Sequence, residues 1–284
     1  MKFLITNFGS SKFLDSLKQA LSETESEYNF AGISSIFTNK FPYSLEDNVF
    51  YFGSVEACKH VFKSTSWKRF FDMELMSCRN YYAAWGDLLL NRHYTMMPLA
   101  EVFRRKEELY NTFGKTMSGL TPEIVPIREQ AIFIRPDSND KVFTGQLVFH
   151  SWFWRFQEKM ALMDMSVHPE TLVMVATPQP ILSEYRCIVH KGKFALGSKY
   201  HTWSDEDSEM LITLDNSVPQ DVIDFVNKVP QLYPDLDLYC LDIARLPGDE
   251  LKVIEMGSVH CAGLYAIDLV KFILLIRKVY DSIC

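Results

Sequence analysis

Two acidic residues, Asp242 and Glu255, carry the clearest chemical pattern in the sequence. A β-hairpin over residues 238–256 with a two-residue turn at 248–249 places them directly opposite each other on one face. A type II turn at 247–248 shifts the register by two residues but keeps both carboxylates on that face. Like charges at a cross-strand spacing of ~4.5–5.5 Å repel each other, and their neighbours are apolar. The pair therefore predicts a Mg²⁺ site, because Mg²⁺ binds few protein oxygens; a chance pairing is the alternative.

A second hairpin, over residues 185–200, carries further charged side chains. With a two-residue turn, Lys199 lies opposite Glu184, and both share one charged face with Arg186. The same alternation places Tyr200 on the apolar face. An antiparallel sheet with one solvated face would explain this pattern without any function.

Two cations, Arg135 and Lys141, flank a polar turn at the end of an apolar strand. A guanidinium and an ammonium in such a position suit contact with phosphates, although two solvated surface cations are the simpler reading. The sequence has no Walker or dinucleotide-binding glycine motif, and its histidines have no metal-binding spacing.

The elements that must position these residues form two regions. Residues 2–6 and 49–52 are short apolar runs, each followed by a helical pattern, which predicts an N-terminal α/β layer with a small parallel sheet. After an apparent linker at 121–126 the chain becomes rich in strands. We place the domain boundary near residue 115. The apolar stretch over 263–280 predicts a buried C-terminal helix.

Composition limits the class of protein. The chain has 284 residues, of which 48% are hydrophobic and 23% charged, as in a folded globular protein. Its formal net charge of -7 argues against nucleic acid as a partner. Neither a signal peptide nor an uninterrupted membrane span is indicated, and the six cysteines form no CxxC pair, so we expect a cytoplasmic protein with reduced thiols and no membrane partner.

The order of these motifs resembles the ATP-grasp superfamily, in particular the RimK-like clade that is recognised by one arginine and two lysines and is common in phage genomes. The resemblance covers roughly residues 120–284. It depends on the following segments: Phe133-Ile134-Arg135-Pro136, Lys141-Val142-Phe143-Thr144-Gly145, Glu184-Tyr185-Arg186, Gly197-Ser198-Lys199-Tyr200, Asp242-Ile243-Ala244 and Val253-Ile254-Glu255.

The resemblance implies an α+β fold in which an N-terminal α/β, pre-grasp-like domain (1–115) precedes an ATP-grasp domain (116–284). That domain would consist of two α+β lobes, about 116–178 and 179–284, which clasp a nucleotide between them. The implied roles are phosphate contact for Arg135 and Lys141, adenine binding by the backbone of Val175 and Ala176, ribose binding for Glu184, nucleotide binding for Lys199, contact with the transferred phosphate for Arg186, and metal binding for Asp242 and Glu255.

The implied activity is that of an ATP- and Mg²⁺-dependent ligase that joins a carboxylate to an amine through an acyl phosphate. The carboxylate and the amine are unidentified, and a peptide or protein is one carrier that we consider. A nucleotide-binding interaction module with little or no ligase activity is the alternative. A polynucleotide ligase or nucleotidyltransferase with Lys141 as an adenylated nucleophile is a third interpretation, which the acidic net charge and the missing motifs of such ligases disfavour.

Two positions depart from the family pattern. Gly257 stands where the family usually has an asparagine, and Arg135 stands where a lysine is common. If only a metal or protonation relieves the repulsion between Asp242 and Glu255, neutral variants of either residue should be no less stable than the wild type without ligand.

Overall fold

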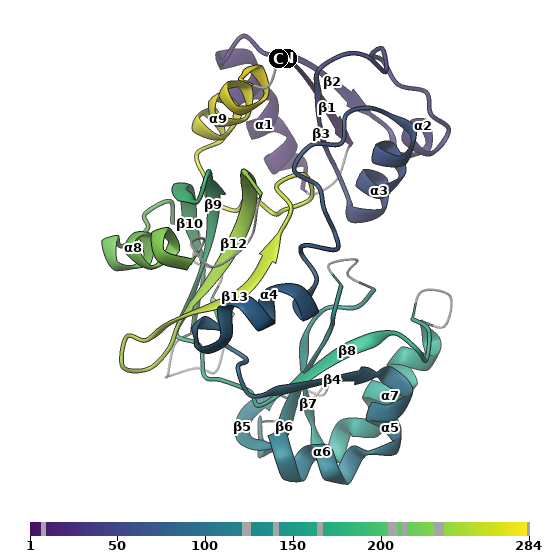
Figure 1. Ribbon diagram of the computed structural model, residues 1–284, viewed down its shortest axis with the longest axis vertical. Helices are drawn as coiled ribbons and strands as arrows, with labels where there is room; N and C mark the ends of the chain where they lie inside the picture. Colours follow the sequence, from purple (N-terminus) through teal and green to yellow (C-terminus); the bar gives the residue numbers. More distant parts are fainter. Residues whose placement is uncertain are drawn as a thin grey trace.

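Three β-sheets lie one after another along the long axis of the molecule (Figure 1). The computed structural model describes residues 1–6, 10–120, 126–138, 142–163, 167–203, 210–211, 215–229 and 236–282. Helices accompany each sheet, which confirms the expected α+β class. None of the helices within these ranges combines the length and the hydropathy that a membrane crossing requires.

The first sheet is the small parallel sheet that the N-terminal pattern predicts. Strand β1 (Lys2–Thr6) lies between β2 (Glu27–Ala31) and β3 (Val49–Phe52), and both pairings are parallel. Sequence analysis missed β2, because its alternation of polar and aromatic residues lacks an apolar run. The accompanying helices are α1 (Ser11–Glu23), α2 (Ile33–Phe37) and α3 (Val55–Ser64).

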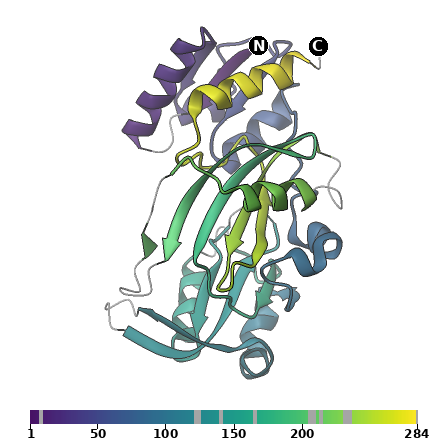
Figure 2. The ribbon, with the colours of Figure 1, turned by 90° about the vertical axis from the view of Figure 1, so that its left-hand side faces the viewer.

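The C-terminal helix returns to this first sheet. Helix α9 (Leu269–Asp281) lies beside α1 at one end of the molecule, where both termini meet (Figures 1 and 2). Its Phe272 joins Phe3 and Phe50 in a single hydrophobic core. Ile188 and Cys240 of the central sheet belong to the same core, so the C-terminal helix fixes the first sheet against the central one.

The sheet at the opposite end has the strand order β4-β8-β6-β5, with β7 also paired to β6. The strands are β4 (Tyr94–Pro98), β5 (Lys115–Leu120), β6 (Pro126–Pro136), β7 (Gln146–Phe149) and β8 (Leu172–Ala176). Helices α5 (Leu99–Arg104), α6 (Lys106–Phe113), α7 (Phe153–Leu162) and the short 3₁₀ helix η2 (His150–Trp152) gather on one side of it (Figure 1).

The segment expected to be a linker instead connects two strands of this sheet. Pro126 already begins β6, which pairs antiparallel with β5, and residues 121–125 lie outside the described part of the chain. Because β4 pairs with β8, the sheet also includes residues that precede the expected boundary near residue 115. The division into domains remains a prediction.

The central sheet is antiparallel, with the order β11-β10-β9-β12-β13. Its strands are β9 (Ser183–His190), β10 (Lys193–Trp203), β11 (Met210–Leu211), β12 (Leu238–Arg245) and β13 (Leu251–Gly257). Helices α4 (Cys78–Trp85) and α8 (Gln220–Lys228) contribute to the core on one face of this sheet, and the 3₁₀ helix η1 (Gly86–Leu88) follows α4.

The predicted register of the β9–β10 hairpin is wrong. Two irregularities interrupt the pairing, between Phe194 and Leu196 and between Lys199 and His201, and the first of them places Lys199 opposite Tyr185 instead of Glu184. A bulge adds one residue to one strand and reverses the side-chain alternation beyond it. Lys199 thereby leaves the charged face, and Tyr200, expected on the apolar face, joins it.

The predicted pairing of Asp242 with Glu255 on β12 and β13 is confirmed. The turn is longer than the predicted two residues. The Leu246 amide donates a hydrogen bond to the Glu250 carbonyl, and Gly248 and Asp249 between them both have positive φ. An irregularity next to Asp242 then shifts the register back. The longer turn and the irregularity cancel each other, and the two carboxylates stay directly opposite.

Candidate active site

A cluster of four charged side chains, here called the charged network, connects the central sheet to the β4–β8 sheet: Arg135, Arg186, Asp242 and Glu255. Its centre is a bidentate ion pair. Arg186 donates from Nε to Asp242 Oδ1 at 2.8 Å and from Nη2 to Oδ2 at 2.5 Å. Only 7% of Arg186 and 2% of Asp242 are exposed, so this pair is shielded from water. Two parallel charge-assisted hydrogen bonds fix the orientation of the guanidinium.

The second carboxylate of the network is bound by an arginine from the other sheet. Arg135, near the end of β6, places Nη2 3.0 Å from Glu255 Oε2, while Arg186 Nη2 lies 3.9 Å from Glu255 Oε1. Each carboxylate therefore has a cationic partner without any metal. The expectation that only a metal or protonation could relieve their repulsion is wrong, because it took no account of Arg135 and Arg186 as partners.

Electrostatics keeps Arg186 charged inside the protein. Burial acts to lower the pKa of Arg186, but the adjacent Asp242 carboxylate outweighs it, and the pKa lies well above its ordinary value. Such a guanidinium is a permanent cation that is fixed in place. A site of this kind is prepared to meet a negatively charged oxygen.

Tyr200 connects Glu184, which lies outside the charged network, to Asp242 of the network. The Tyr200 hydroxyl donates to Glu184 Oε2 at 2.5 Å and approaches Asp242 Oδ2 at 3.3 Å, while His201 Nδ1 lies 3.6 Å from the same Glu184 oxygen. Burial raises the pKa of Glu184, and the hydrogen bond from Tyr200 partly opposes that shift. Tyr200 was not predicted as a site residue, because the irregularity between Phe194 and Leu196 reverses the face of the sheet on which it lies.

The loop after β13 covers Arg186 with an aromatic ring. Gly263 accepts a hydrogen bond from Arg186 Nη1 at 3.0 Å, and the Tyr265 ring lies 5.0 Å from the guanidinium carbon. Tyr265 stacks on Tyr200 with ring centroids 4.4 Å apart and remains 40% exposed. Its φ of 49° is uncommon for a residue other than glycine. No sequence motif indicated this residue.

The remaining predicted site residues lie outside the charged network. Val175 and Ala176 end β8, are buried, and pair with Ile134 and Phe133 of β6. Lys199 projects from the opposite face of the central sheet from Arg186, because its cross-strand partner is Tyr185. Lys141 lies outside the described residues.

The two carboxylates of the network suit a single magnesium ion. Mg²⁺ in phosphate sites is held by one or two carboxylates together with phosphate oxygens and water. Asp242 and Glu255 supply such a pair, and the part of the chain that the structure describes contains no group of three or more His, Cys, Asp or Glu side chains able to hold a metal. The donor set fits the ion once a polyphosphate completes its coordination.

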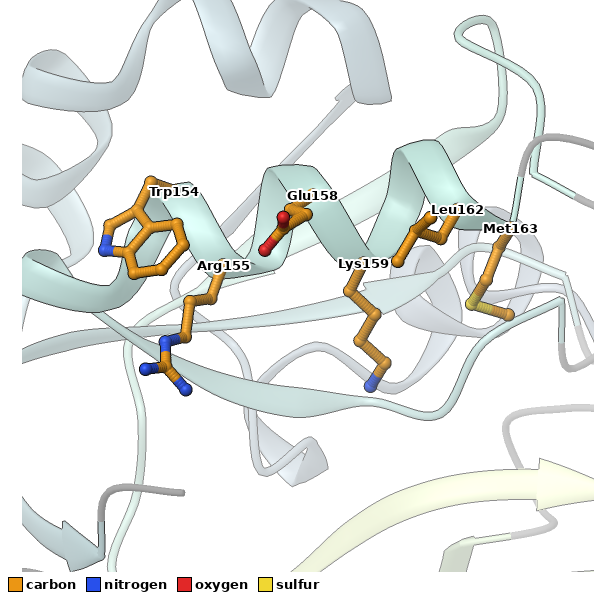
Figure 3. Close-up of a pocket in the computed structure, with 6 residues that line it drawn as sticks. All are labelled: Trp154, Arg155, Glu158, Lys159, Leu162 and Met163. Atoms are coloured by element: carbon orange, nitrogen blue, oxygen red, sulfur yellow. The ribbon is translucent and has the colours of Figure 1, made fainter. Parts of the chain in front are cut away.

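A hollow of about 710 Å³ lies along α7, and no residue of the charged network lines it (Figure 3). Its lining consists of Trp154, Arg155, Glu158, Lys159, Leu162 and Met163. None of these side chains is a predicted site residue. The hollow therefore contributes nothing to the charged network.

Three solved structures that share the fold of this chain are named as a synthetase, a macrocyclase and an ATP-grasp ligase. The chain is similar to D-cycloserine synthetase DcsG, with a TM-score of 0.60 and 10% identity over 98% of this chain and 99% of that chain. The macrocyclase MdnC bound with precursor peptide MdnA, from Microcystis aeruginosa MRC, has a TM-score of 0.54 and 10% identity over 97% and 99%. The ATP-grasp ligase PsnB, complexed with minimal precursor, Mg and ADP, has a TM-score of 0.51 and 10% identity over 98% and 96%.

Sequence comparison supplies the family. No curated protein sequence matches the chain. The sequence model described as "ATP-grasp domain, R2K clade family 3" matches residues 94–275, which is more than half of the chain and includes the whole charged network. The resemblance to the ATP-grasp superfamily is thereby confirmed, and the chain belongs to the R2K clade family 3 of ATP-grasp domains.

Proposed function

We propose that this ATP-grasp protein is an ATP- and Mg²⁺-dependent ligase that joins a carboxylate to an amine. The charged network is the observation that carries the proposal. It places two buried guanidinium groups beside two carboxylates where two sheets meet. Transfer of a phosphoryl group depends on positioning and on neutralisation of negative charge, and this cluster supplies groups for both tasks.

The proposed reaction has two steps. An oxygen of the substrate carboxylate attacks the γ-phosphorus of ATP, the bond from that phosphorus to the β–γ bridging oxygen breaks, and ADP leaves. The amine nitrogen then attacks the carbonyl carbon of the acyl phosphate, inorganic phosphate leaves, and the nitrogen loses a proton to water. Arg186 would bind the transferred phosphate, and Arg135 would bind the nucleotide phosphates.

Magnesium, when bound, would neutralise and orient the phosphates. Asp242 and Glu255 would hold it from adjacent strands. In our proposal Glu184 binds the ribose, and the backbone at Val175 and Ala176 binds the adenine. The precursor peptide bound to MdnC supports a peptide as carrier of one of the substrates.

A catalytically silent nucleotide-binding module is the second candidate. Gly257 favours it, because it offers no side chain beside Glu255 where the family usually has asparagine. In this case the protein would bind Mg-ATP without consuming it.

Hydroxylamine distinguishes the two candidates without knowledge of the amine. It is a strong nucleophile that converts an acyl phosphate into a hydroxamic acid. Protein, Mg-ATP, hydroxylamine and a panel of amino acids and short peptides would be incubated together, and ADP and hydroxamate would be measured. A ligase should release both in equal amounts with at least one carboxylate.

The matched variants lie on one hairpin. Glu255→Gln removes a charge from the network, whereas Glu250→Gln removes an exposed charge that only pairs with Lys252 at 2.8 Å. We expect Glu255→Gln to abolish turnover and Glu250→Gln to retain it. If Mg-ATP raises the melting temperature but no carboxylate in the panel leads to release of ADP, the result would favour the silent module. Absence of both effects would contradict both candidates.

A further inference from the structure

We propose that Arg135 and Arg186 take the place of one metal ion, so that the site binds a single divalent cation with each nucleotide. This inference rests on the proposed function and specifies how its charges are balanced. It concerns the number of metal ions and the role of the two guanidinium groups.

The number of oxygen ligands limits how many metal ions the site can hold. Asp242 and Glu255 face each other across β12 and β13, and the next position of β13 on the same face is Gly257. A Cβ atom added at Gly257 would meet nothing within 4 Å, so the strand offers open space there and no donor. Two carboxylates hold one Mg²⁺ together with phosphates and water. Glu184 is the next carboxylate, but it is linked to Asp242 through the Tyr200 hydroxyl, and the described residues contain no group of three or more His, Cys, Asp or Glu side chains that could hold a metal.

The arginines are fixed where a second cation would act. Only 7% of each is exposed, and Arg186 is held by Asp242, by the Gly263 carbonyl at 3.0 Å and by the Tyr265 ring. A metal that binds Asp242 and Glu255 would share these carboxylates with the guanidinium groups. Their donors would then turn to the anionic oxygens nearest to them, which are those of the nucleotide phosphates.

Charge balance supports the same conclusion. The charged network carries two positive and two negative charges, and is therefore neutral as a whole. A polyphosphate that enters it brings several negative charges, and one divalent ion supplies two positive ones. Because arginine stays protonated in proteins, the two guanidinium groups cancel the charges of the two carboxylates, and the network with one divalent ion has a net charge of +2. The combined charge of the two guanidinium groups equals that of a second divalent ion.

The number of bound metal ions is measured directly with Mn²⁺, which replaces Mg²⁺ and is detected by electron paramagnetic resonance. Protein in excess over the non-hydrolysable analogue AMP-PNP would be titrated with Mn²⁺. We expect one bound Mn²⁺ per nucleotide in the wild type. Gly257→Asn restores an oxygen donor in the open space and should raise the number to two. Gly32→Asn is the control, because Gly32 also has no atom within 4 Å of an added Cβ but lies in the first sheet's region.

The role of Arg135 has its own readout. Arg135→Gln should weaken binding of AMP-PNP at least tenfold and leave the binding of adenosine, which has no phosphate, unchanged. An equal weakening of both ligands would mean that Arg135 only supports the fold, and would overturn its part in the inference.

The outcomes separate the inference from the proposed function. Two Mn²⁺ per nucleotide in the wild type would overturn the inference and leave the ligase proposal intact. One Mn²⁺ in Gly257→Asn would overturn the assignment of the missing ligand to residue 257. If AMP-PNP does not bind at all, the proposed function itself fails.

Discussion

Removing the charge of Asp242 should destabilise the protein without ligand. The Asp242→Asn variant keeps one oxygen acceptor but deprives the Arg186 guanidinium, only 7% exposed, of its bidentate counter-ion and leaves it Glu255 at 3.9 Å. Breaking a buried ion pair from one side costs about 3–5 kcal/mol. In a chain of this size that loss lowers the melting temperature by on the order of 10 °C. This reverses the sign expected from the sequence, where the carboxylates had no arginine partners.

A double-mutant cycle measures this pair directly. Asp242→Asn, Arg186→Met and the double variant would be compared by urea unfolding without nucleotide or metal. The double variant should be more stable than the sum of the single losses predicts, because it leaves no unpaired buried charge. Asp249→Asn is the control in the same hairpin, since the Asp249 carboxylate is 85% exposed and lies 3.4 Å from Arg245. A melting temperature of Asp242→Asn equal to that of the wild type would refute the ion pair and restore the earlier expectation.

Three further changes test the surroundings of the site and the core. Gly145→Ala places a Cβ 2.8 Å from the Phe133 ring, so calorimetry should show a loss of about 1–3 kcal/mol, whereas Gly32→Ala, with nothing within 4 Å, should melt almost as the wild type does. Tyr200→Phe removes a hydroxyl that contacts two carboxylates and should cost about 1.5–3 kcal/mol of unfolding free energy in urea; an unchanged midpoint would count against those contacts. Burial lowers the pKa of His260 to about 4, although its hydrogen bonds to two backbone carbonyls act to raise the pKa. In this pH range the His260 side chain therefore stays neutral in the folded protein and takes up a proton in the unfolded chain. Stability should therefore fall as pH drops from about 6.5 to about 4, and the slope should be smaller in His260→Gln; equal slopes would contradict the shift.

The first sheet and the central hairpins could be predicted because local pattern determines them. Residues 2–6 and 49–52 are apolar runs next to helical patterns, and they form β1 and β3 as expected. Strand β2 was not predicted because its polar and aromatic residues alternate and form no apolar run. Helix α4 was also missed. Its N-terminus is bonded by Asp137, which accepts from the Arg79 amide at 2.8 Å across a large sequence separation.

The register of a hairpin depends on features that the sequence does not display. At β9–β10 the irregularity between Phe194 and Leu196 moved Lys199 off the charged face and brought Tyr200 onto it. At β12–β13 a longer turn and an irregularity compensated each other, so the predicted pair was right although the predicted turn was wrong. The predicted pairing of Asp242 with Glu255 is therefore correct because two deviations from the predicted hairpin cancel each other.

Contacts between separate sheets follow no short-range rule, and this limited the prediction of the site most. Arg135 and Glu255 are distant in sequence and lie on strands of different sheets, yet their side chains approach to 3.0 Å. The sequence identifies both residues as site candidates, but it does not indicate that one neutralises the other. If the two carboxylates had no cationic partner, a metal would be needed between them, and removal of one of their charges would not lower the stability of the protein. With both guanidinium groups in place the same carboxylates stabilise the protein, so a metal must compete with two arginines before it can bind.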